Sequence, residues 1–145
     1  MSLPLLEHLH GHLGVLAVAL LFHPAILLWQ GQPLSRGGRW AIYATLAMIT
    51  CAFVLGLWIY PPYRDLVRHD LTLMNPEAAL LFETKEHLAW GALAAALGGS
   101  LAALLAPRTA VGIRRIAARA FACAALLGLA VGLLGIHIAS IHTFS

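Results

Sequence analysis

The sequence contains very little charge for its length. Only 10% of its 145 residues are charged, 61% are hydrophobic, and the mean hydropathy is +0.84. In soluble globular domains roughly a quarter of the residues are charged. This composition therefore excludes an ordinary soluble domain and indicates a single integral membrane domain that comprises residues 1–145.

Other features are also scarce. Cys51 and Cys123 are the two cysteines, and both lie within apolar runs, so a framework of structural disulfides is not expected. No basic stretch is interleaved with aromatic residues, which argues against a nucleic-acid partner. The N-terminal segment lacks a basic start and a small-residue cleavage site near residue 25. We interpret it as a retained helix rather than a cleaved signal.

Long apolar runs, in contrast, make up most of the chain. Four of them, at about residues 3–29, 39–60, 76–106 and 117–142, are each near the length of a helix that crosses a bilayer. The connections between them are short, except for the segment 61–75. The sequence therefore predicts an all-α, antiparallel four-helix transmembrane bundle.

Proline and asparagine predict how these helices begin, end and bend. Pro61 and Pro62 predict the end of the second helix, because proline lacks an N–H and clashes with the preceding turn. Asn75 is suited to cap the third helix, since the proline after it fits the first helical position. Pro24 predicts a kink in the first helix and a freed backbone carbonyl near Leu20.

The few charges are unevenly distributed along the chain. The two connections on one side carry no acidic residue and six arginines, namely Arg36, Arg39, Arg108, Arg114, Arg115 and Arg119. The other side carries all six acidic residues. Under the positive-inside rule the arginine-rich connections are cytoplasmic, so both termini should lie on the outer, periplasmic side of a bacterial inner membrane. Tyr60, near the outer end of the second helix, is interpreted as a residue of the interfacial belt.

Histidine is the most informative residue type in this chain. Eight histidines are present, and seven are expected on the outer side of the membrane. A neutral imidazole is costly in hydrocarbon and usually has a function there. In the first helix His8, His12 and His23 fall within roughly 60° of one another, at about 100° per residue, whereas His10 points elsewhere.

Histidines of three helices are expected at one depth. With a rise of about 1.5 Å per residue, His12, His87 and His137 come to lie roughly 10–12 Å above the membrane centre. Such a layer suits a b-type haem, which needs one or two axial imidazoles from facing helices and cations for its propionates. The candidate cations are Arg64, Arg68 and Lys85.

A metal ion is the main alternative to haem. Two pairs of ligand residues stand four positions apart, one pair in the first helix and one in the third, so that each pair shares a helical face. Together with a histidine of the last helix they could hold zinc, copper or iron ions. The candidate ligands, in two layers, are His8, His12, Glu83, His87, His137 and His142.

A third hypothesis is that these histidines only tie helices together. The chain would then be a non-catalytic accessory subunit of a membrane complex, with other membrane subunits as its partners. Under each of the three hypotheses the lipid bilayer surrounds the bundle.

The pattern resembles small four-helix membrane b-type cytochromes, in which hydrophobic helices carry histidines near one face of the bilayer. The resemblance covers the architecture of most of the chain and reaches His12, His87 and His137 as axial ligands. The preferred hypothesis is a single b-type haem near the outer face, for electron transfer to or from quinone or a periplasmic electron carrier. The alternative is an enzyme, a metal- or haem-dependent membrane oxidoreductase. The second helix departs from a layout with a haem on each side of the membrane, since residues 41–60 contain no histidine.

Overall fold

The computed structural model describes the backbone of residues 3–143, and their side chains except at 3, 4, 66, 67, 70, 142 and 143. Within this part of the chain every regular element is a helix. Four helices are long and apolar enough to cross a membrane: α1 (Leu3–Trp29), α2 (Arg36–Tyr63), α4 (Pro76–Leu105) and α5 (Val111–Thr143). A π-helical turn, η1 (Arg64–Arg68), and the short helix α3 (His69–Met74) connect α2 to α4. The predictions of an all-α fold and of four helices long and apolar enough to span a membrane are confirmed.

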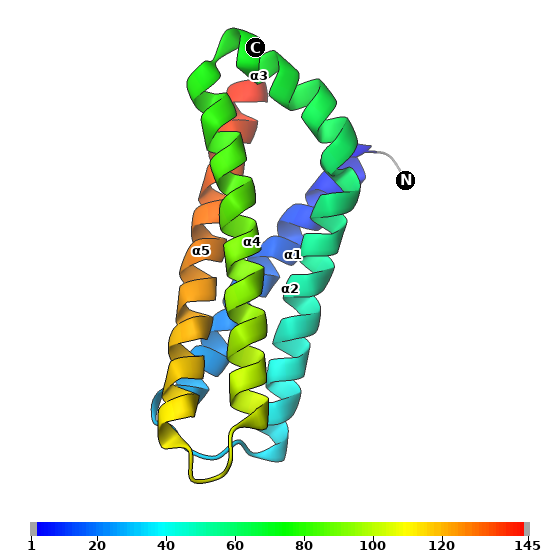
Figure 1. Cartoon of the computed structure of the whole chain (residues 1–145). Helices are drawn as coiled ribbons and strands as arrows, with labels where there is room; N and C mark the ends of the chain where they lie inside the picture. Colours follow the sequence, from blue (N-terminus) through cyan, green and yellow to red (C-terminus); the bar gives the residue numbers. More distant parts are fainter. Residues whose placement is uncertain (1–2, 144–145) are drawn as a thin grey trace.

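The four long helices pack side by side (Figure 1). α5 contacts α1 and α4, and α2 contacts the same two helices, so α1 and α4 lie across the bundle from each other. The connections 30–35 and 106–110 lie at one end, which we call the arginine end (Figure 1). η1 and α3 lie at the opposite end, which we call the α3 end.

Small residues line the contacts between the helices. Ala92 and Ala96 of α4 and Ala124 of α5 are buried in the main core. At Gly99 an added Cβ would lie 3.2 Å from the Cβ of Ala120, so the two backbones approach closely there. Close approach of this kind favours helix association in lipid, where burial of apolar surface gives little advantage. Large apolar side chains such as Ile136 point outward, as expected for a surface that a bilayer covers.

Two of the predicted helix features are confirmed in atomic detail. The side-chain oxygen of Asn75 accepts a hydrogen bond from the N–H of Ala78 at 3.2 Å, and Pro76 occupies the first turn of α4. Pro24 lies inside α1, and the carbonyl of Leu20, one turn earlier, faces the Thr45 hydroxyl at 3.3 Å. The same hydroxyl lies 2.9 Å from the carbonyl of Ala41 in its own helix, so its single hydrogen is shared and only partly replaces the donor that proline removes.

The segment 61–75 corrects one expectation from the sequence. α2 does not end before Pro61 but continues through both prolines to Tyr63, and the chain then remains helical through η1 and α3. The fixed φ of proline is compatible with a helix, and the cost lies in the missing N–H groups. The N–H of Arg64 donates to the carbonyls of Tyr60 and Pro61, after which the wider π-helical turn begins. The helix therefore continues through both prolines, and a π-helical turn follows.

Two helices also begin earlier than expected, both at the arginine end. α2 starts at Arg36, because the hydroxyl of Ser35 accepts a hydrogen bond from the N–H of Gly38 at 3.0 Å and caps the helix. α5 starts at Val111 rather than near residue 117. Arginines that the sequence suggested for a connection, such as Arg114, are therefore held at helical positions.

Candidate functional site

The histidines of the predicted layer come from three different helices, and all three are exposed on the isolated chain. They are His12 on α1, His87 on α4 and His137 on α5. None is buried in the core, and the helices that carry His12 and His87 lie across the bundle from each other. The structure therefore does not bring the three imidazoles into one enclosed slot.

Two of these imidazoles are oriented by their own helices. The Nδ1 of His12 lies 2.7 Å from the carbonyl of His8, and the Nδ1 of His87 lies 2.8 Å from the carbonyl of Glu83. A carbonyl oxygen can only accept, so in both rings Nδ1 must carry the hydrogen and donate it. The Nε2 atom is then unprotonated in the neutral ring. Metal-ligating histidines commonly donate the second ring nitrogen to a carbonyl in this way.

The second predicted layer is only partly assembled. Glu83 is half-buried and forms an ion pair with Arg68, and His8 is exposed on α1. The side chain of His142 lies outside the described residues. Among the side chains that the structure describes, no three His, Cys, Asp or Glu residues are close enough to hold a metal ion.

The three candidate partners for haem propionates differ in their surroundings. Arg68 donates to Glu83, and this hydrogen bond raises the pKa of the Arg68 guanidinium above its ordinary value. The Nζ of Lys85 lies over the ring of Phe82, 4.8 Å from its centroid, and 5.5 Å from the centroid of Tyr63. Arg64 is exposed. Arg64 is thus the most accessible of the three, whereas Lys85 points inward and is stabilised by aromatic faces.

A polar group that the sequence did not single out lies inside the α3 half of the bundle. The hydroxyl of Tyr60 on α2 donates to Oε2 of Glu86 on α4 at 3.1 Å. Oε1 of Glu86 is buried, and no hydrogen-bond partner for it exists among the described residues. A carboxylate oxygen without a partner inside a membrane bundle is costly and marks a candidate functional group.

His10 also lies inside the bundle, although the sequence excluded it from the ligand layer. Its Nδ1 donates to the carbonyl of Ala52 on α2 at 3.0 Å. Gly56, one turn further along α2, leaves room for the ring, because a Cβ there would lie 2.8 Å from the His10 Cε1 atom. Helical periodicity correctly separated His10 from His8 and His12, yet it could not show that His10 faces a neighbouring helix.

The pairing of Tyr60 with Glu86 was missed for a different reason. The two residues are 26 positions apart, and a tyrosine near the end of an apolar run is typical of the interfacial belt. A signal was nevertheless available, since Glu86 is an acidic residue one position before His87, close to the hydrocarbon segment. Only the packing of α2 against α4 reveals its partner.

The site therefore combines oriented, exposed imidazoles with a partly buried acid–phenol pair in the same half of the bundle. Comparison with known proteins adds no family to this description. No family model, curated protein or solved structure matches the chain.

Proposed function

We propose that this protein is a membrane b-type haem protein that carries electrons near the outer face of the membrane. The observation that supports this most directly is the geometry of His12 and His87. In each ring Nδ1 donates to a carbonyl of the same helix, which leaves Nε2 available as an iron ligand. A haem requires only one or two such ligands, whereas a metal ion requires a converging set of three or more.

A haem held by these residues would lie on the surface of the isolated chain. The imidazoles of His12, His87 and His137 are exposed on the isolated chain, so a haem bound by one of them would cover side chains that lipid cannot satisfy. Arg64 is exposed and could approach a propionate. When bound, the haem would supply one-electron transfer, and the chain would orient its axial ligand and neutralise its propionates.

The partly buried acid–phenol pair of Glu86 and Tyr60 supports quinone as a redox partner. Quinone takes up or releases protons along with electrons, so a quinone site needs groups that can exchange protons. The Oε1 atom of Glu86 has no partner among the described residues and could accept a hydrogen bond from a quinol hydroxyl. Tyr60 holds the other oxygen and so fixes the carboxylate. A periplasmic electron carrier remains the alternative partner at the same face.

The proposal includes an antiparallel bundle with both termini outside and the arginine end in the cytoplasm of a bacterium. A cysteine introduced at Gly112 is expected to resist a membrane-impermeant thiol reagent in intact cells and to react after permeabilisation. The site suits this test, because nothing lies within 4 Å of an added Cβ at Gly112. The matched control is Met74→Cys in α3, which should react in intact cells. Both variants are made in a background with Cys51 and Cys123 replaced by alanine. Labelling of Gly112→Cys in intact cells would invert the proposed orientation.

The haem proposal predicts a coloured protein. Protein purified in mild detergent from haem-replete cells is expected to show a Soret band and, after reduction, the α and β bands of a b-type haem. A preparation that is colourless and stays unchanged after addition of hemin would contradict the proposal. Metal analysis of that same preparation would then test for a zinc, copper or iron ion.

One observation favours a second candidate, the accessory subunit. His23, like the three histidines of the layer, is exposed although it lies in a membrane-spanning helix. A neighbouring subunit could cover these imidazoles with hydrogen bonds, just as a cofactor could. Colourless protein that co-purifies in a stable stoichiometric membrane complex would support this candidate over the haem protein.

A further inference from the structure

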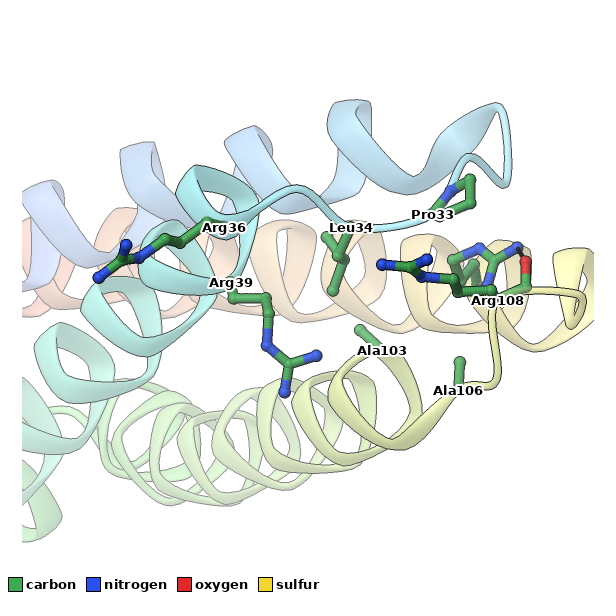
Figure 2. Close-up of a pocket in the computed structure, with 8 residues that line it drawn as sticks. Pro33, Leu34, Arg36, Arg39, Ala103, Ala106 and Arg108 are labelled. Atoms are coloured by element: carbon green, nitrogen blue, oxygen red, sulfur yellow. Dashed lines mark hydrogen bonds between the residues drawn. The ribbon is translucent and has the colours of Figure 1, made fainter.

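A cavity lined by arginines lies at the arginine end of the bundle. It encloses about 290 Å³ between the connection 30–35, the start of α2 and the end of α4 (Figure 2). Its lining residues are Pro33, Leu34, Arg36, Arg39, Ala103, Ala106, Arg108 and Arg114. Arg39 extends from α2 toward the end of α4 (Figure 2). Half of the lining residues are thus arginines from three different segments of the chain.

Arg114 forms the rigid wall of this cavity. It is 2% exposed, and its guanidinium donates to three backbone carbonyls, those of Gly31 at 2.7 Å, Pro107 at 2.6 Å and Arg108 at 2.9 Å. These bonds tie the two connections of the arginine end to α5. They also fix the backbone from which the Arg108 side chain extends. Hydrogen bonds within the protein therefore hold the cavity in shape, and they do not require a bound ligand.

The arginines of this region have no acidic residue near them in the sequence. No aspartate or glutamate occurs between residues 8 and 64 or after residue 86. The guanidinium of Arg114 is neutralised by carbonyl dipoles alone, and the other three arginines lie beside the cavity. α2 and α5 begin at this end and α1 and α4 finish there, so the helix dipoles oppose one another and the positive field comes from the arginines. The charge of its lining therefore favours an anion in this cavity.

The shape and position of the cavity indicate the kind of anion. Guanidinium groups bind phosphate through paired N–H donors, and basic pockets between transmembrane helices at the cytoplasmic side bind anionic lipid headgroups. The other wall is apolar, with Leu34, Ala103 and Ala106, and could cover the glycerol and upper acyl region of a lipid. A soluble phosphate compound would not need such a wall.

We propose that this arginine cavity binds the phosphate headgroup of an anionic phospholipid, with Arg39 and Arg108 as the groups that contact it and Arg114 as the residue that holds the backbone of Arg108 in place. The proposal does not depend on haem binding. It depends on the proposed orientation only for the leaflet, which would be the cytoplasmic one.

The test measures how much phosphatidylglycerol the full-length protein binds. Protein delipidated in detergent is titrated with phosphatidylglycerol or phosphatidylcholine in mixed micelles, and bound lipid is counted by native mass spectrometry. The double variant R39Q/R108Q is expected to lose at least about tenfold in affinity for phosphatidylglycerol. The matched control is R115Q/R119Q, which removes two exposed arginines of α5 that do not line the cavity. This control should bind like the unmodified protein.

Three outcomes would overturn the proposal. Equal loss of binding in both double variants would mean that net charge alone attracts the lipid. Equal binding of phosphatidylglycerol and phosphatidylcholine by the unmodified protein would mean that the cavity does not select an anionic headgroup. Saturation by inorganic phosphate, with no further effect of phosphatidylglycerol, would assign the cavity to a soluble phosphate. Circular dichroism of each variant confirms that the helices remain folded.

Discussion

Replacing Arg114 with leucine is expected to lower the free energy of unfolding by about 3 kcal/mol or more. Hydrogen bonds that involve a charged group contribute about 1.5–3 kcal/mol each, and Arg114 donates three of them to the carbonyls of Gly31, Pro107 and Arg108. Part of this loss is offset, because leucine removes the cost of burying a charge. The three carbonyls would nevertheless be left without their donor in a buried region.

The backbone around Gly31 makes this loss harder to repair. Gly31 adopts a left-handed conformation, with φ of 72°, and an added Cβ would lie 2.5 Å from Cγ1 of Val111. The turn is therefore held close to the start of α5 and cannot easily rearrange to satisfy its own carbonyl. Arg114→Lys should also destabilise the protein, since one ammonium on a flexible stem lacks the planar fork of donors that arginine presents.

The measurement is reversible unfolding of the detergent-solubilised protein by sodium dodecyl sulfate, followed by circular dichroism. Arg115→Leu is the matched control, because Arg115 is the next residue of the same helix, carries the same charge and is exposed. Its substitution is expected to change the unfolding free energy by no more than about 0.5 kcal/mol. If Arg114→Leu and Arg115→Leu unfold alike, the network around Arg114 does not stabilise the fold.

The second large effect concerns the haem. His87→Ala is expected to abolish haem binding, and so is at least one of His12→Ala and His137→Ala. Few side chains can replace an axial imidazole, so loss of a ligand should remove the Soret band or change the spin state of the iron. The orientation of the His12 and His87 rings by carbonyls of their own helices makes each of them a leading candidate for an axial ligand, as alternatives rather than as a pair, because their helices lie across the bundle from each other.

The haem and iron content of three variants distinguishes residues that bind the cofactor from residues with a structural role. His69→Ala should retain haem, since His69 lies at the start of α3 and not in a membrane-spanning helix. His10→Ala should also retain haem, although it loses the hydrogen bond to Ala52. Glu83→Gln removes the carboxylate but preserves the backbone carbonyl that orients His87. Loss of iron from Glu83→Gln would favour a metal-ion site, and equal haem content in all variants would assign the histidines to packing.

Much of the architecture follows from the linear sequence because each feature is local. Apolar length alone predicts four spanning helices, and Asn75 followed by proline predicts the start of α4. The carbonyl freed by Pro24 was also predictable, since the loss of an N–H affects a position one turn earlier in the same helix. The expectation for Pro61 and Pro62 was wrong, because proline disfavours a helix without forbidding it: its φ is compatible with the helix, and only its N–H is missing.

The partners of polar side chains were decided only by the tertiary structure. Tyr60 meets Glu86 and Arg114 meets Gly31 across 26 and 83 positions of sequence, and no periodicity within one helix can predict such pairs. The same reason explains the histidines. Helical spacing placed His12 and His10 on different faces of α1, but which face meets α2 depends on how the helices rotate and pack. Composition determined that four helices of this chain are apolar enough to cross a membrane, whereas helix packing decided which of its polar groups are buried, because burial is a property of several helices together.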